Sequence, residues 1–170
     1  MTEMQDSDRE DVLRLLIQVN PTAALWDEKG GVIRDALRDA AWAEILNDTV
    51  NYIIRDMDGT FIGRVCMQHL SDECPEVGIE LFEQYRNRGF GPEALSAFIA
   101  WYKATSGQQR IKARIEQDNA HSQHVFKKLG AVYDTNDTAL REATIRRLKE
   151  VLPEADISDL KIRDIQIYYL

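Results

Sequence analysis

One short stretch of the sequence, residues 86–91, combines two arginines with two glycines. Glycines let the backbone approach a ligand closely and adopt conformations that other residues avoid, so successive N–H groups can point at one phosphate group. Pro92 follows, and proline suits the first turn of a helix because its missing N–H is not needed there. The start of such a helix carries about half a positive charge. The stretch therefore predicts an anion site made by Arg86, Asn87, Arg88, Gly89, Phe90 and Gly91.

Two better-known phosphate-binding motifs do not account for this stretch. A dinucleotide site needs G-x-G-x-x-G with an acidic residue about 20 positions further on, and a nucleotide phosphate loop ends in Gly-Lys-Ser/Thr. The sequence shows neither pattern. The alternative to an anion site is a tight surface turn whose arginines are solvated.

The residues around the stretch predict a strand, a glycine turn and a helix in direct succession. Residues 76–82 are typical of a strand, and residues 110–116 alternate apolar and charged side chains, as in a half-buried strand. Between them, helical spacing over residues 93–104 places four apolar side chains on one face: Leu95, Phe98, Ile99 and Tyr102. The order predicts a βαβ unit with a right-handed crossover.

The remaining elements follow from the same periodicities. Asp58-Gly59, between two runs of strand-forming residues, predicts a hairpin with a two-residue turn. Gly130 predicts the end of a short helix, and Pro153 follows a later one. Helices are expected at residues 7–19, 32–47, 119–129 and 137–152, and strands at 131–134 and within 161–170. We expect an α/β protein with a mixed sheet covered by helices.

Composition bounds the class of protein. A chain of 170 residues with 44% hydrophobic residues fits one domain, residues 1–170, and no repeat or linker divides it. A net charge of −8 argues against binding to nucleic acid or to an anionic membrane surface. The two cysteines lack metal-ligand spacing and the three histidines do not pair with them, so no metal is expected. His121 and His124 are one helical turn apart, which leaves a metal site there as the alternative to two surface histidines. Without a signal-peptide pattern or an apolar run of about 18 residues, we expect a cytoplasmic protein.

Arg86-x-x-Gly89-x-Gly91 after a strand resembles the R/Q-x-x-G-x-G/A motif of the GNAT superfamily of N-acetyltransferases. EVGIELFEQYRNRGFGPEALSAFI is similar to that superfamily's fourth strand, pyrophosphate loop and following helix. RIKARIEQDNAHSQHVFKKLGAVYD is similar to its fifth strand and next helix. Together the two blocks cover Glu76 to Asp134, and they look closest to the ribosomal-protein alanine acetyltransferase-like subset.

The resemblance implies a GNAT acyl-CoA N-acyltransferase fold, in which the fourth and fifth strands splay apart to hold acetyl-CoA or a related acyl-CoA. Backbone groups of Leu81 and Phe82 would pair with the pantetheine arm, and the 86–91 stretch would hold the pyrophosphate. Asn119 would contact the arm near the thioester, although asparagine there also suits a helix N-cap. Ser122 and Phe126 would line the coenzyme.

The implied reaction is acetyl transfer to a primary amine of a small molecule or of a protein N-terminus. An alkyl amine, with a pKa near 10.4, is about 99.9% protonated at pH 7, so a group must take its proton, and a positioned carboxylate is suited to this, directly or through water. Glu80 and Glu76 share one face of the expected strand and are the candidate bases; the alternative is that they face solvent. Phe126 stands where the superfamily often has a tyrosine that protonates the thiolate. Tyr85 or Tyr133 would protonate the thiolate instead; the alternative is that both are packing residues.

Two further departures from the superfamily bear on function. Only a few residues precede the first helix, so the first strand is expected to be short or absent. The extra helix at 137–152, before the last strand, is expected to shape the choice of acceptor; alternatively it packs, or forms a homodimer contact. The leading hypothesis is an acetyl-CoA-dependent N-acetyltransferase. The alternatives are a catalytically silent coenzyme A-binding sensor and a domain for another phosphate ligand.

Overall fold

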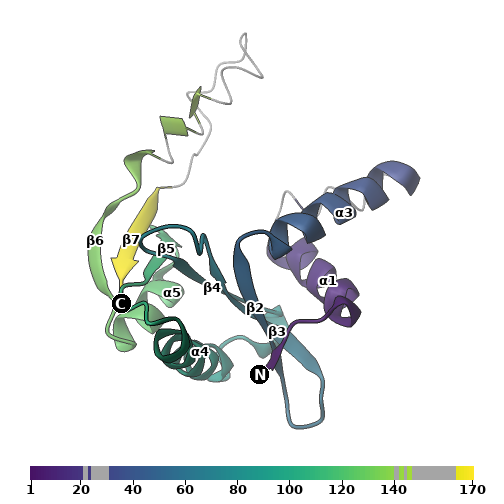
Figure 1. Ribbon diagram of the computed structural model, residues 1–170, viewed down its shortest axis with the longest axis horizontal. Coiled ribbons are helices and arrows are strands. Elements are labelled where there is room, and N and C mark those ends of the chain that lie inside the picture. Colours follow the sequence, from purple (N-terminus) through teal and green to yellow (C-terminus); the bar gives the residue numbers. More distant parts are fainter. Residues whose placement is uncertain (21–22, 24–30, 140–141, 144, 147–163) are drawn as a thin grey trace. The chain divides into compact units, whose positions relative to one another are not determined.

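The computed structural model describes residues 1–20, 23, 31–139, 142–143, 145–146 and 164–170 (Figure 1). The chain forms two compact units, Met1–Gln109 and Arg110–Leu170, which are described in turn. No described helix is long and apolar enough to cross a membrane.

The first unit is built on an antiparallel meander. Its strands follow the chain in the order β1-β2-β3-β4, and each pairs with the next one. The first strand has two residues, which confirms that it is short. The strands are β1 (Thr2–Glu3), β2 (Thr49–Arg55), β3 (Phe61–Gln68) and β4 (Glu76–Leu81).

The hairpin between β2 and β3 is confirmed, but its predicted two-residue turn is wrong. Asp56 and Thr60 close the loop, with Asp56 N–H donating to the Thr60 carbonyl at 3.1 Å. The Asp56 carboxylate accepts from the N–H groups of Asp58 and Thr60, at 3.0 and 2.9 Å. Gly59 takes a φ of +82°, which places it after the turn rather than at its centre. A side chain that can satisfy two loop amides favours the longer loop.

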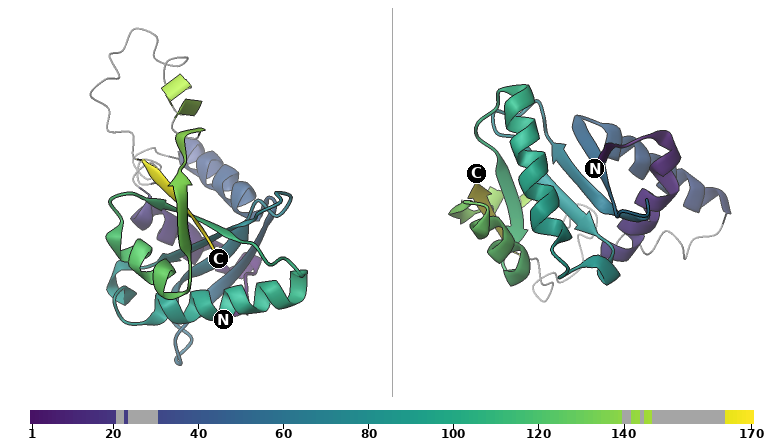
Figure 2. Two further views of the ribbon diagram at one scale, coloured as in Figure 1. Left: turned by 90° about the vertical axis from the view of Figure 1, so that its left-hand side faces the viewer. Right: turned by 90° about the horizontal axis from the view of Figure 1, so that it is seen from below.

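Helices lie on both faces of this sheet (Figure 2). A short 3₁₀ turn, η1 (Asp6–Asp8), leads into α1 (Arg9–Val19), and α3 (Gly31–Leu46) packs beside α1. This agrees with the helices expected at 7–19 and 32–47 to within two residues. On one face, side chains of α1 and α3 join the strands in a buried cluster: Val12, Leu15, Ile45, Ile53, Phe61 and Phe82.

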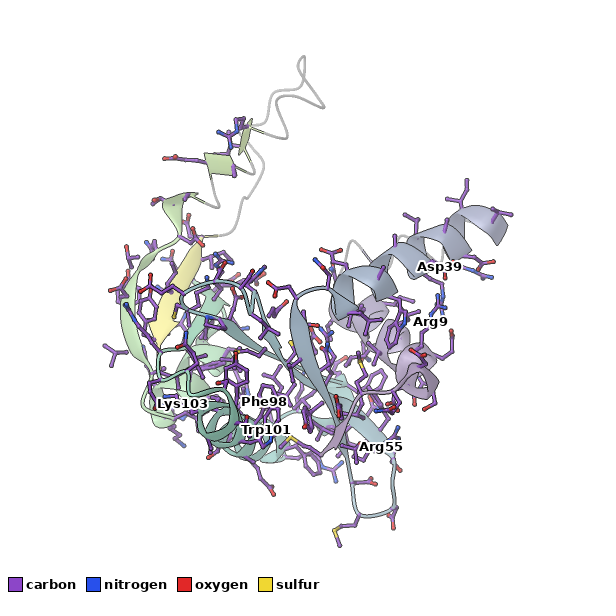
Figure 3. The ribbon with its side chains drawn as sticks, viewed as in Figure 1. Arg9, Asp39, Arg55, Phe98, Trp101 and Lys103 are labelled. Atoms are coloured by element: carbon purple, nitrogen blue, oxygen red, sulfur yellow. The ribbon has the colours of Figure 1, made fainter. Side chains whose placement is uncertain are left out.

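The other face is covered by α4 (Phe90–Ser106). Phe98 and Trp101 of this helix (Figure 3) contact Tyr52 of β2, with ring centroids 5.7 and 4.8 Å apart. The helix begins at Phe90, three residues before the expected start. Its N-cap is Gly89 in the left-handed conformation, so Pro92 occupies the third helical position, where its missing N–H still costs nothing.

The described part of the second unit includes a three-stranded antiparallel sheet and a short helix. The strand β5 (Lys112–Glu116) pairs with β7 (Ile165–Tyr169), which pairs with β6 (Val132–Asn136). Burial of Ile111, Ala113 and Ile115 confirms the half-buried pattern. The helix α5 (Ala120–Lys128) ends two residues before Gly130, whose φ is +92°.

The expected helix over 137–152 falls largely outside the described residues. Among those described, residues 138–139, 142–143 and 145–146 are helical. Leu140, Leu148 and Leu152, which the sequence places on its apolar face, lie outside the described residues, as does the segment 147–163 that leads to β7. Its role in acceptor choice or in a homodimer stays a prediction.

Candidate active site

The end of β4 is tied down on both sides. Phe82 N–H donates to the carbonyl of Ile62 at 3.1 Å. The Phe82 ring is buried in the cluster that α1 and α3 form with the strands, here called the α1-side cluster. A single 3₁₀ turn, η2 (Glu83–Tyr85), follows, and Glu83 N–H donates to Gln18 of α1 at 3.2 Å. These contacts fix where the chain enters the glycine stretch.

Residues 86–91 form an exposed loop, here called the amide loop, that opens α4. Asn87 and Gly89 are both left-handed, with φ of +60° and +90°. Within the described residues, none of the N–H groups of residues 87–91 donates a hydrogen bond to the protein. Consecutive N–H groups without partners at the start of a helix attract anions. The loop thus has the local geometry that an anion site needs, and the site itself stays a prediction.

The two arginines of the amide loop differ from other arginines of the first unit because they lack a described carboxylate partner. Among the described residues of the first unit, six arginines have a carboxylate within ion-pair distance: Arg9, Arg14, Arg34, Arg38, Arg55 and Arg64. Arg86 and Arg88 form no ion pair with any described residue. Both therefore offer their charge to a ligand.

The two loop arginines are held by different contacts. Arg86 donates from Nε to the Leu81 carbonyl at 3.1 Å. The Arg88 guanidinium lies over the rings of Tyr85 and Phe90, 5.7 and 5.6 Å from their centroids. Because the Leu81 carbonyl and the Phe82 N–H already have partners, pairing with a pantetheine arm would use the remaining lone pair of that carbonyl or neighbouring groups.

The two candidate carboxylates, Glu76 and Glu80, lie on one face of β4, as expected. Their cross-strand partners on β3 are Gln68 and Arg64. Arg64 holds Glu80 through two hydrogen bonds, Nε to Oε2 at 2.8 Å and Nη2 to Oε1 at 3.0 Å. The Arg64 side chain is 7% exposed and that of Glu80 is 27% exposed. Glu80 is thus at the boundary between the core and solvent.

The Arg64 side chain is also held from β2. Its Nη1 donates to Asn51 Oδ1 at 3.1 Å, and Asn51 donates in turn to the carbonyl of Ile45, in the last turn of α3, at 3.0 Å. Burial, the largest single effect, lowers the pKa of Arg64, but attraction to the Glu80 carboxylate, the nearby Cys66 and the hydrogen bonds to Glu80 together raise it more, so the pKa lies above its ordinary value. The guanidinium is therefore a permanent charge inside the unit.

Sequence reasoning missed this network. Asn51, Arg64 and Glu80 are far apart in the sequence, and only the register of β2, β3 and β4 places them in contact. One signal was available, because Arg64 is the charged residue in the otherwise uncharged strand FIGRVCMQ. An arginine in such a strand needs a buried partner.

The remaining candidate residues belong to the second unit. Asn119 is the N-cap of α5, and its Oδ1 accepts from Ser122 N–H at 3.0 Å. This confirms the capping role and leaves the Asn119 NH₂ group for a ligand. Phe126 is buried, and it offers no proton. Tyr133 is exposed and donates to Asn136 at 3.2 Å, whereas Tyr85 packs against the α1-side cluster.

No group of three or more metal-ligating side chains occurs within the part of the chain that the structure describes. His121 and His124 are therefore not joined there by the acidic or thiol partners that a metal site requires. Cys66 is a free, buried thiol. Burial raises the pKa of the Cys66 thiol to about 12, although nearby Arg64 lowers it. Cys66 is thus unsuited to act as a nucleophile.

Comparison with solved structures gives the fold. A chimera of the spermidine N-acetyltransferase SpeG from Vibrio cholerae and hSSAT matches with a TM-score of 0.70 and 12% identity, covering 99% of this chain and 94% of that one. The dodecameric spermidine N-acetyltransferase from Vibrio cholerae matches with a TM-score of 0.68 and 15% identity, covering 99% and 91%. These likenesses confirm a mixed α/β fold of the GNAT type.

Sequence comparison gives the family. No curated protein matches the chain. The acetyltransferase (GNAT) domain profile matches residues 1–132, a span that includes the amide loop, β4 and Asn119. The chain therefore belongs to the GNAT family of acetyltransferases, enzymes that transfer an acetyl group to an amine.

Proposed function

We propose that this protein takes its acetyl group from acetyl-CoA, binds the coenzyme's pyrophosphate at the amide loop, and delivers the acetyl group to a cationic primary amine. The proposal rests on two observations about the amide loop. The N–H groups of residues 87–91 make no hydrogen bond to any described residue, and Arg86 and Arg88 have no carboxylate partner among the described residues. In a chain of net charge −8, this is a local positive site.

The residues of the loop suit a pyrophosphate. The start of α4 contributes about 0.3–1 kcal/mol to a nearby anion, and up to about 2 kcal/mol when the anion is partly buried. Arg86 and Arg88 add charge-assisted hydrogen bonds, which are about twice as strong as neutral ones. Bound acetyl-CoA would supply an activated thioester. Leu81 and Phe82 for the arm, and Asn119, Ser122 and Phe126 along the coenzyme, complete the proposed set.

The acceptor amine must lose a proton. A positioned carboxylate contributes roughly 10²–10⁴-fold to such a step, and Glu80 and Glu76 are the candidates. The neutral amine nitrogen forms a bond to the acetyl carbon, the carbon–sulfur bond breaks, and the sulfur leaves with the bonding electrons, while the nitrogen releases its second proton to solvent. A thiol has a pKa of about 8.5, so its thiolate is a tolerable leaving group and Phe126 need not supply a proton.

Two observations support a cationic acceptor. The chain carries 29 acidic residues against 21 basic ones, and the solved structures of similar fold include spermidine N-acetyltransferases. The resemblance to the ribosomal-protein alanine acetyltransferase-like subset supports a peptide N-terminus as the second acceptor class. No described residue favours the regulatory alternative. We also retain, as predictions, a single domain, a homodimer and a cytoplasmic location.

The first test is thermal unfolding with and without acetyl-CoA. At about 100 times its Kd, a ligand stabilises the folded state by about 2.7 kcal/mol. In a chain of this size the melting temperature would rise by roughly 5–11 °C. Pantetheine, which has no pyrophosphate, is the control and should give a much smaller shift. An unchanged melting temperature at millimolar acetyl-CoA would contradict the proposal.

The second test is turnover. Thiol release from acetyl-CoA is measured with spermidine, a simple alkyl diamine and a short peptide with a free N-terminus. Faster release with one of them identifies the acceptor class. Coenzyme binding without release in any of the three would support the sensor instead.

A further inference from the structure

We infer that Arg64 is a positioning residue, which holds the Glu80 carboxylate in the orientation that meets the acceptor amine. The inference rests on the proposed function and deepens it. It also separates the two candidate bases, because it assigns the contact with the amine to Glu80 and not to Glu76.

The separation follows from the geometry of β4. Four residues of a strand span about 13 Å, so Glu76 and Glu80 cannot both reach the same acetyl group. Glu80 directly precedes Leu81, the last residue of the strand, and the amide loop begins a few residues later. Glu76 lies at the opposite end of β4. A pantetheine arm that starts at the loop and pairs with Leu81 therefore reaches Glu80 before Glu76.

Arg64 leaves Glu80 able to bind an amine. A carboxylate has about four lone-pair positions, and Arg64 occupies one on each oxygen. The remaining positions are on a side chain that is 27% exposed, while the Arg64 side chain is 7% exposed. The arginine thus holds the carboxylate from the core side and leaves its outer side to an ammonium group.

The network behind Arg64 makes the placement rigid. Asn51 joins the guanidinium to the Ile45 carbonyl, so α3, β2, β3 and β4 are linked through one chain of hydrogen bonds. The flanking residues Ile62 and Val65 are fully buried. Two apolar side chains would stabilise such a site equally well, because the cost of burying charges offsets their attraction. Stability alone therefore does not explain an arginine here.

The test compares Arg64→Met, Arg64→Lys, Glu80→Gln and the double variant Arg64→Met/Glu80→Gln. We measure kcat and KM for spermidine, or for whichever amine of the panel is turned over, and the Kd of acetyl-CoA by calorimetry. Misplacing a reacting group by about 1 Å can cost 10²-fold, so Arg64→Met should lower kcat/KM for the amine at least about tenfold. The Kd of acetyl-CoA should change by less than about twofold, because the substitution affects the reaction with the amine and not the binding of the coenzyme.

Lysine keeps the charge but cannot form the two-pronged contact. Arg64→Lys should therefore bind acetyl-CoA normally and show an intermediate kcat/KM. If Arg64→Met does not fold, Arg64→Lys tests the inference on its own. The double variant should be no slower than Glu80→Gln, because both changes remove the same function.

Arg55→Met is the matched control. Arg55 makes an ion pair with Asp8 in the same unit, and these side chains are 34% and 8% exposed. This variant should lose stability and keep kcat/KM. If the Arg64 variants also lose only stability, or if the Arg64 and Glu80 effects multiply, the inference is wrong. Failure of the proposed function is distinguishable, because wild-type protein would then bind no acetyl-CoA or acetylate no amine.

Discussion

Gly63 faces Leu81 across the β3–β4 ladder with no room for a side chain. A Cβ at Gly63 would lie 2.2 Å from the Glu80 carbonyl oxygen and 2.7 Å from Leu81 Cδ2. A Cβ at Gly91, on the other side of Leu81, would lie at an ordinary 3.6 Å from Cδ1. The leucine at the end of β4 is thus packed tightly on the sheet side only.

Gly63→Ala should therefore lower the free energy of unfolding by about 3 kcal/mol, the upper end of overpacking costs, because backbone must move. Gly91→Ala should leave stability unchanged or raise it by up to about 1 kcal/mol, since alanine restricts the unfolded chain. Urea unfolding of both variants measures the difference. Equal effects at the two positions would contradict the packing described here.

Gly89→Trp should abolish acetyl-CoA binding and leave the protein folded. Gly89 has open space around its Cβ position, so an indole there would lie over the loop amides without displacing the core. Gly107 is the matched control, because it caps the other end of α4 with a φ of +75° and also has open space. Both tryptophan variants strain a left-handed residue, at a cost of about 1–3 kcal/mol.

Calorimetric titration with acetyl-CoA distinguishes the two. Binding by Gly107→Trp and none by Gly89→Trp is the expected result. Retained affinity in Gly89→Trp would move the coenzyme away from the amide loop.

Alkaline pH should destabilise the protein through Cys66. In the unfolded chain the thiol ionises near its ordinary pKa of 9.0, whereas in the folded protein its pKa is about 12. Between these values the folded state binds more protons than the unfolded state, so stability falls as pH rises, by about 1.4 kcal/mol per pH unit. Below pH 9 this contribution is constant.

Cys66→Ala removes the effect, and it also controls for the lysines and tyrosines that titrate in the same range. The measurement is urea unfolding of both proteins at pH 7, 9 and 10. Parallel curves of stability against pH for wild type and Cys66→Ala would show that the buried thiol does not matter.

Asn119 should show two separable roles. Asn119→Ala removes the cap of α5 and should cost about 0.5–2 kcal/mol of stability. Asn119→Asp keeps the oxygen that accepts from Ser122 N–H but loses the NH₂ group, so it should keep stability and weaken acetyl-CoA binding if that group contacts the coenzyme. Melting curves and titration of both variants test this. Wild-type affinity in Asn119→Asp would leave only the cap.

The sequence predicted best what depends on neighbouring residues. The alternation around Ile111, the cap at Asn119 and the glycine after α5 are local features, and the structure confirms each of them. The start of α4 was misplaced because Pro92 suits any position in the first turn, and only the left-handed backbone of Gly89 determines which one it takes.

Features that depend on the pairing of distant residues were not predictable. Arg64 and Glu80 meet because β3 and β4 align in one register, and the sequence alone does not specify that register. The longer hairpin loop depends on the Asp56 carboxylate, which accepts from the amides of Asp58 and Thr60. In both cases the sequence shows the charged side chain but not the group with which it pairs.

Arg86 and Arg88, which form no ion pair with a described residue, affect how fast the two substrates associate with the protein. The protein as a whole is acidic, so its long-range field repels an anionic coenzyme and attracts a cationic amine, whereas Arg86 and Arg88 attract phosphates only at short range. At an ionic strength of 0.1 M the Debye length is about 10 Å, so salt screens the distant field first. Moderate salt should thus slow the association of a polyamine while leaving, or even speeding, the association of the coenzyme.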